Sequence, residues 1–297
     1  MAKLLVEKLQ TLEGHRDAVY ALTNDKNSTA FYSSGGDGMV VKWELGKEDG
    51  DLLVKVPNSV YALAYSSGFL AIGHNYDGIH WVDVATKKEI KNIHLGDAAI
   101  FDIKIKDNFI YVAMGSGELV VISILDFSIK FRKYYSNQRI RKIFFHKDLI
   151  YLGSSDNQIK ILDKNLNLIK NWDAHLNTVT GLAIYEDTLI SVGRDARIKF
   201  WSISENYTLL HEIPAHLYAI NELSLSPNKK YFATCSIDKT IKIWDTKKMS
   251  LLKVIDKQRS AGHGTSINKI FWENDHQIVS SSDDRTLSVW SIQPVEK

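Results

Sequence analysis

A set of four residue types recurs four times along this chain at nearly constant spacing. A His is followed 16 to 18 residues later by Ser or Thr, then by Asp four residues on and by Trp six residues beyond that. The sets are His15, Ser33, Asp37, Trp43; His175, Ser191, Asp195, Trp201; His216, Thr234, Asp238, Trp244; and His263, Ser280, Asp284, Trp290. A repeat of this length constrains the architecture more than any single residue does.

The same register continues through the middle of the chain, where the Trp position falls on Val82, Ile122 and Leu162. Successive Trp-equivalent positions are then 39 to 46 residues apart. Each copy contains four short apolar runs separated by turn-forming residues, for example 19–22, 30–33, 40–43 and 52–56 in the first copy. Such runs are typical of strands, so the sequence predicts seven units of four strands each.

The pattern resembles the tryptophan-aspartate (WD) repeat family of β-propellers. The resemblance is carried by Gly14-His15, Ala174-His175, Ala215-His216 and Gly262-His263 with their Trp residues, although among the Trp residues of the four sets only Trp244 is followed by Asp. It implies an all-β fold: a single domain, residues 1–297, forming a seven-bladed propeller of four-stranded antiparallel blades. The expected blades are approximately 14–56, 57–95, 96–135, 136–173, 174–214, 215–261 and 262–297. The alternating segment 3–12 is expected to pair with the last blade and close the ring.

The Ser, His and Asp of each set could also suggest a hydrolytic triad, such as Ser191, His175 and Asp195. A triad needs an exposed Ser beside an oxyanion hole, whereas this Ser is expected within a strand. The resemblance implies instead a buried structural tetrad, in which Trp bonds to the hydroxyl, the hydroxyl to His, and His to Asp. Because an enzyme needs one working site and a scaffold needs one brace per repeat, we expect no catalytic residue and no enzymatic activity.

Blades two to four lack this tetrad, and only Asp156 survives at the turn position. We expect these blades to depend more on apolar packing. His74 and His80 flank a turn, with His94 further on, but no His-Glu-x-x-His or paired-cysteine motif occurs. The segment is interpreted as a polar turn, and the sequence predicts no metal site and no cofactor.

Composition limits the partners. The net charge is +2 and the Lys residues are dispersed, which does not favour nucleic acid. No apolar run approaches the ~20 residues needed to span a bilayer, and no signal segment is evident, so we expect a cytoplasmic protein without membrane contact. The single Cys235 excludes an intramolecular disulfide. We expect the chain by itself to be monomeric.

The resemblance implies binding at the rim of the central channel, where first strands begin and turn residues gather. The residues assigned to this rim are Tyr20, Tyr61, Phe101, Arg139, Arg141, Thr180, Arg194, Asn221, Asn268 and Asp283. Blades one to three contribute aromatics and blades four and five contribute Arg, which favours a protein or peptide partner with an acidic or carboxylate end. Two alternatives stay open: a propeller enzyme, hydrolase or metal-dependent, with a site in the channel, and a binder of nucleic acid or phospholipid headgroups.

Overall fold

The computed structural model describes residues 3–295, and within them the secondary structure is almost entirely β. It contains 28 strands and one short helix, α1 (Lys257–Ser260). The strands form seven antiparallel sheets of four strands each, with β3 and β4 as an example of the antiparallel register. The predicted all-β fold of seven four-stranded blades is therefore confirmed.

The chain divides into two compact units. Unit 2 comprises Tyr20–Glu44 and Asp51–Val179. Its blades are β2 (Val19–Asn24), β3 (Ala30–Gly35), β4 (Met39–Glu44), β5 (Asp51–Lys55); β6 (Val60–Ser66), β7 (Phe69–His74), β8 (Gly78–Asp83), β9 (Lys88–His94); β10 (Ile100–Lys106), β11 (Phe109–Met114), β12 (Glu118–Ser123), β13 (Ile129–Tyr134); and β14 (Ile140–His146), β15 (Leu149–Ser154), β16 (Gln158–Leu162), β17 (Leu168–Asp173).

Unit 1 comprises Met1–Val19, Leu45–Gly50 and Thr180–Lys297. Its blades are β18 (Val179–Tyr185), β19 (Thr188–Gly193), β20 (Arg197–Ser202), β21 (Thr208–Pro214); β22 (Ile220–Leu225), β23 (Tyr231–Ser236), β24 (Ile241–Asp245), β25 (Ser250–Ile255); and β26 (Ile267–Asn274), β27 (Gln277–Ser282), β28 (Leu287–Val295), with β1 (Lys3–Leu12). The predicted seventh blade ran to residue 297, and residues 296 and 297 lie outside the described residues.

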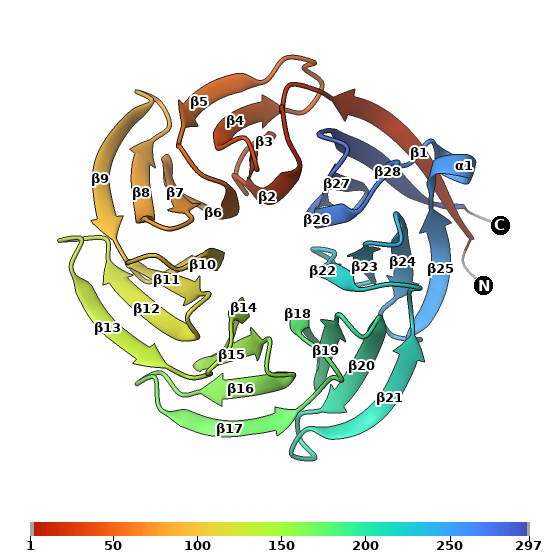
Figure 1. Cartoon of the computed structure of the whole chain (residues 1–297). Helices are drawn as coiled ribbons and strands as arrows, with labels where there is room; N and C mark the ends of the chain where they lie inside the picture. Colours follow the sequence, from red (N-terminus) through yellow and green to blue (C-terminus); the bar gives the residue numbers. More distant parts are fainter. Residues whose placement is uncertain (1–2, 296–297) are drawn as a thin grey trace. The chain divides into compact units, whose positions relative to one another are not determined.

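The N-terminal strand completes the last blade, as predicted. β1 pairs antiparallel with β28, from Lys3 opposite Val295 to Leu12 opposite Leu287, and Figure 1 shows these two strands side by side. Leu4 and Leu12 are buried while Leu5 and Leu9 are exposed. This alternation explains the pairing, because one face of the strand must cover the apolar surface of the sheet.

The Trp position of the repeat has one structural meaning in all seven blades. It lies on the third strand, opposite a buried apolar residue of the second strand: Trp43 faces Phe31, and in the degenerate blade two Val82 faces Leu70. The same register holds for Ile122 with Ile110, Leu162 with Ile150, Trp201 with Leu189, Trp244 with Phe232 and Trp290 with Ile278. The register predicted for the degenerate copies is confirmed.

Apolar cores form between neighbouring blades within each unit. In unit 2, for example, Trp81 and Ile93 of blade two cluster with Ile103 and Val120 of blade three. In unit 1, Ile241 and Ile243 of blade six cluster with Trp290 of blade seven. Among residues 3–295 no helix is long and apolar enough to cross a membrane.

Candidate functional site

A β-bulge lies near the start of the first strand in five blades. The ladder to the second strand skips one residue in each: Tyr61 in β6, Phe101 in β10, Arg141 in β14, Asn221 in β22 and Asn268 in β26. A bulged residue leaves the regular pleat, so its side chain is redirected. All five are residues that the sequence assigned to the rim.

In unit 2 the bulged Tyr61 and Phe101 form one row of aromatic rings with Tyr20 of β2. Tyr20 and Tyr61 meet edge to face, with ring centroids 5.1 Å apart and planes at 78°. Tyr61 and Phe101 are stacked, with centroids 5.8 Å apart and an interplanar angle of 4°. All three rings are partly exposed. The row therefore presents apolar area with few rotatable bonds, which suits an interface anchor.

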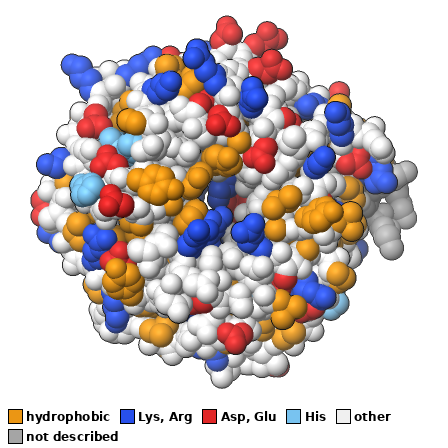
Figure 2. Space-filling view, viewed as in Figure 1, with side chains coloured by type: hydrophobic (Ala, Val, Ile, Leu, Met, Phe, Trp, Pro, Cys, Tyr) orange, Lys and Arg blue, Asp and Glu red, His pale blue; other side chains and the backbone are white. Residues whose placement is uncertain are grey.

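Two arginines extend the row from blade four. The Cζ atom of Arg141 lies 4.0 Å from the centroid of Phe101, and that of Arg139 lies 5.8 Å from it. Both contacts are cation–π interactions, in which the ring face attracts the guanidinium. We call Tyr20, Tyr61, Phe101, Arg139 and Arg141 the aromatic–arginine row. The face in Figure 2 likewise shows hydrophobic side chains beside Lys and Arg side chains.

The rim residues of unit 1 are mostly engaged with their own unit. Thr180 is buried, and its hydroxyl donates to the Ile220 carbonyl at 2.6 Å. Asn221 Nδ2 donates to the Ile267 carbonyl at 2.9 Å. Asn268 Nδ2 donates to the Val19 carbonyl at 3.1 Å and to Asp283 Oδ1 at 2.7 Å. Arg194 and Asp283 are exposed. The row has no counterpart among these side chains.

Sequence reasoning missed an apolar patch in unit 1. Leu217 is 84% exposed, Tyr218 64% and Ile237 37%. They lie on adjacent loops, since Ile237 N–H donates to the Ala219 carbonyl and Ser236 Oγ donates to the Tyr218 carbonyl. One sequence signal could have indicated this patch, namely the residue that follows the tetrad His. It is Leu in blades five and six, whereas it is Arg16 in blade one and Gly264 in blade seven.

The tetrad of blade six is a directed chain of hydrogen bonds. Trp244 Nε1–H donates to Thr234 Oγ1 at 2.9 Å, Thr234 lies 2.8 Å from His216 Nε2, and His216 Nδ1 lies 2.9 Å from Asp238 Oδ2. With Thr234 donating to Nε2, the neutral imidazole carries its proton on Nδ1, and this N–H donates a hydrogen bond to Asp238. Burial lowers the pKa of His216. Burial alone would raise the pKa of Asp238, but hydrogen bonds from His216, Thr240 and the Leu217 amide outweigh it and lower that pKa.

Blade seven repeats this chain. Trp290 Nε1–H donates to Ser280 Oγ at 2.9 Å, and His263 bridges Ser280 and Asp284 with contacts of 2.9 Å on each side. In blades five and one, Trp201 donates to Ser191 at 2.9 Å and Trp43 to Ser33 at 2.7 Å. The four hydroxyl residues of these sets are fully buried, so none of them presents a nucleophile to solvent.

Blades two to four contain polar clusters of their own, each built around a carboxylate, and only the carboxylate of blade four, Asp156, lies at the turn position of the repeat. In blade three, Arg132 donates to both oxygens of Glu118 at 2.7 and 3.0 Å, which lowers the pKa of Glu118. In blade four, Lys160 Nζ donates to Asp156 Oδ2 at 2.6 Å, and Ser136 Oγ donates to the same atom at 2.6 Å. These polar contacts add to the apolar packing on which the three blades were expected to depend more strongly.

In blade two the carboxylate is Asp77, which lies among three histidines. Its Oδ2 is 3.3 Å from His74 Nδ1 and 3.1 Å from His80 Nε2, and its Oδ1 is 3.0 Å from His94 Nδ1. The hydrogen bond from His94, followed by that from Asn92, lowers the pKa of Asp77 to about 2. The segment interpreted as a polar turn is therefore a convergence of ionisable side chains.

Comparison with known proteins supports the resemblance seen in the sequence. A family model described as "WD domain, G-beta repeat" matches residues 6–44, 207–245 and 255–291. The striatin homolog of Dictyostelium discoideum is 25% identical over 239 residues, covering 77% of this chain and 26% of the relative. Actin-interacting protein 1 of Caenorhabditis elegans is 22% identical over 312 residues, covering 95% of this chain and 48% of the relative. The chain thus spans less than half the length of either relative.

A solved structure gives the same picture of the fold. The crystal structure of the WD40 β-propeller domain of Doa1 aligns with a TM-score of 0.84 at 20% identity, covering 96% of this chain and 97% of that one. At this identity the likeness concerns the fold and carries no information on the ligand.

Proposed function

Because this chain belongs to the WD-repeat family of β-propellers, we propose that it is a non-enzymatic scaffold that binds a protein or peptide at the aromatic–arginine row. The relative Actin-interacting protein 1 is named for its interaction with another protein. For this chain the favoured ligand has an apolar body and an anionic end, either a C-terminal carboxylate or acidic side chains.

The single observation that carries the proposal is the continuity of the row. Arg141 lies against Phe101 at 4.0 Å, Phe101 stacks on Tyr61, and Tyr61 meets Tyr20. Rings in contact lose little entropy when a ligand covers them, because they are already held in place. A guanidinium held by an aromatic face keeps its planar donors for a carboxylate. An apolar ligand segment with an adjacent carboxylate complements both properties.

The alternative of a propeller enzyme finds less support. The hydroxyl residues of the four tetrads are fully buried, and each accepts a hydrogen bond from its Trp indole. A hydroxyl in this setting has no access to a substrate carbonyl. An anionic ligand without an apolar body would use the arginines but leave the three rings without a role.

A selection from a peptide-display library tests the proposal. The full chain should enrich peptides that combine acidic residues or a free carboxyl terminus with Leu, Ile or aromatic residues. The dissociation constant of an enriched peptide is then measured with the Arg139→Glu/Arg141→Glu double variant. Charge reversal removes hydrogen bonds to charged groups worth about 1.5–3 kcal/mol each, so affinity should fall well over tenfold.

The matched control is the double variant Lys88→Glu/Lys91→Glu, which makes the same charge change at exposed positions of β9 in the same unit. It should leave the peptide affinity within about twofold, since screened surface charges away from the site contribute little. Equal losses in both double variants would show only nonspecific electrostatics. An unchanged affinity in the row variant would place the binding surface elsewhere.

A further inference from the structure

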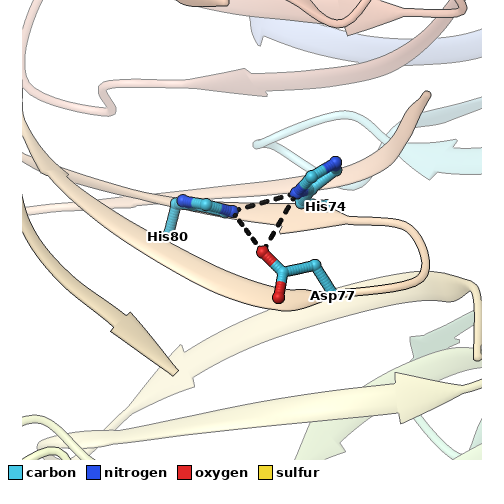
Figure 3. Close-up of side chains that lie close together, drawn as sticks. All are labelled: His74, Asp77 and His80. Carbon is cyan, nitrogen blue, oxygen red and sulfur yellow. Dashed lines mark hydrogen bonds and ion pairs between the residues drawn. The ribbon is translucent and has the colours of Figure 1, made fainter. Parts of the chain in front are cut away.

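Three side chains of blade two point their polar atoms at one another (Figure 3). His74 Nδ1 lies 3.0 Å from His80 Nε2, and Asp77 Oδ2 lies 3.3 Å from the first nitrogen and 3.1 Å from the second. Over residues 3–295, this is the one group of at least three His, Cys, Asp or Glu side chains whose candidate ligand atoms all lie within 4.8 Å. The histidine side chains are 5% and 10% exposed and that of Asp77 is 26% exposed.

The turn between β7 and β8 creates this convergence. His74 still pairs with Gly78, which leaves Asn75, Tyr76 and Asp77 to make the turn, with Tyr76 in the left-handed region at φ 67°. A Cβ on Gly78 would lie 2.0 Å from the Ile93 carbonyl oxygen, so only glycine fits where the turn meets β9. The turn carries the Asp77 carboxylate to the two histidines on the flanking strands.

The spacing of the three atoms matches a metal coordination shell. In tetrahedral Zn²⁺ sites with Zn–N and Zn–O bonds of about 2.0–2.1 Å, neighbouring ligand atoms are about 3.3 Å apart. The three separations here are 3.0, 3.1 and 3.3 Å. We propose that His74 Nδ1, His80 Nε2 and Asp77 Oδ2 bind one zinc ion, with the fourth position left to water.

The surrounding residues orient these ligands as the second shell of a zinc site does. Glu89 Oε2 lies 2.5 Å from His80 Nδ1 and accepts a hydrogen bond from that nitrogen, so the lone pair of Nε2 faces the cluster. A carboxylate behind a metal-bound imidazole fixes its tautomer in this way. His94 Nδ1 holds the other oxygen of Asp77 at 3.0 Å, which keeps Oδ2 directed at the two histidines.

One contact must change when the metal binds. The Asn58 amide donates to His74 Nε2 at 3.1 Å, which places the proton of the neutral ring on Nδ1. Zinc at Nδ1 displaces this proton and requires it on Nε2, where it opposes the Asn58 N–H. Binding should therefore shift His74 to the tautomer protonated on Nε2 and reorient the Asn58 amide, which gives the site a local signature besides affinity.

The competing explanation is a simple ion pair. Lys160, Lys199 and Lys242 occupy the register position of His80 in blades four, five and six, each opposite the counterpart of Ile72. Lys160 pairs with Asp156 at 2.6 Å. A protonated His80 beside Asp77 could replace that pair without any metal. This comparison also supplies two substitutions that the fold accepts. His80→Lys introduces the residue type found at the same position in blades four to six. His74→Ser introduces the residue type found at the corresponding strand ends, which are Ser154, Ser236 and Ser282.

The experiment titrates the chelator-treated full chain with ZnCl₂ by calorimetry, and with CoCl₂ by visible absorption as a report of nitrogen and oxygen ligands. We expect one equivalent to bind to the parent and affinity to fall more than a hundredfold in His80→Lys and in His74→Ser. Glu89→Gln should weaken binding by about 10–100-fold. His211→Lys, at an exposed position of β21 in the other unit, is the matched control and should bind as the parent does.

In NMR spectra, the amide signals of Asn58 and Ser59 should shift when zinc is added to the parent and should not shift when it is added to His80→Lys. No zinc binding by the parent, with His80→Lys equally stable, would overturn the proposal in favour of the ion pair. Zinc binding that survives in both His80→Lys and His74→Ser would also overturn it, because the ion would then be held elsewhere.

Discussion

The guanidinium of Arg141 rests on the ring of Phe101, with Cζ 4.0 Å from the ring centroid. The two residues occupy the same bulge position in the first strands of neighbouring blades, β14 and β10. The bulge thus sets side chains from different repeats against each other outside the regular pleat. Their contact joins the aromatic and the cationic parts of the proposed binding surface.

Replacing Phe101 by Leu should weaken both stability and peptide binding. Aromatic pairs contribute about 0.5–1.5 kcal/mol and exposed cation–π contacts about 0.5–1 kcal/mol, so the free energy of unfolding should fall by about 1–2 kcal/mol. Urea denaturation measures the change. Tyr134→Leu, at a position 64% exposed on β13, should stay within about 0.5 kcal/mol of the parent. Equal effects in the two variants would mean that the row contributes nothing specific.

The tetrads should contribute stability without contributing to binding. Ser191→Ala removes the acceptor of the Trp201 indole, and His216→Ala removes the link between Thr234 and Asp238. Each substitution strands a buried polar group, which costs about 1–3 kcal/mol. Chemical denaturation should show this loss, and peptide affinity at temperatures where the protein stays folded should be nearly unchanged. Ser250→Ala at an exposed position of β25 serves as the control. Loss of a hydrolytic activity in a folded Ser191→Ala protein would instead support the enzyme alternative.

Deleting residues 1–12 should expose the edge of β28, because β1 pairs along it from Lys3 to Leu12. An unpaired edge invites association with other chains, so solubility and melting temperature should both fall. Point variants refine the test: Leu4→Ala at a buried position should cost about 2–5 kcal/mol, and Leu5→Ala, 56% exposed, less than about 0.5 kcal/mol. A deletion variant as soluble and stable as the parent would contradict the role of β1.

Stability should fall as the pH drops from about 7.5 to 5, in part through His216. Its pKa is lowered below the ordinary 6.5 by burial, so the folded state binds the proton less readily than the unfolded state. The contribution of His216 is complete above pH 6.5 and decreases below it, by at most about 1.4 kcal/mol per pH unit. Burial also lowers the pKa of His74, which acts with the same sign. Urea midpoints of the parent and of His216→Gln should therefore converge as the pH falls, and parallel pH profiles would contradict this assignment.

Much of the fold could be predicted from the repeat alone. Trp43, Trp201, Trp244 and Trp290 define a period. The third strand of each blade keeps a buried residue at this position even where Trp is replaced by Val82, Ile122 or Leu162. The outer strand of the last blade also followed from the sequence, because residues 3–12 alternate in polarity and lie outside the seven repeats. These features depend on side-chain period and turn chemistry, which are local.

The candidate sites depended on contacts that local patterns do not encode. The sequence assigned Tyr20, Tyr61, Phe101 and Arg141 to one rim, but their stacking follows from bulges and from the packing of neighbouring blades. Likewise, the sequence alone indicated that His74, Asp77 and His80 belong to a polar turn. The pairing of β7 with β8 leaves three residues for that turn and brings the ligand atoms within 3.3 Å of one another. The sequence determined which residues each strand and turn contains. The tertiary structure decided which side chains meet, because turn length and blade packing are set by pairing across the whole sheet.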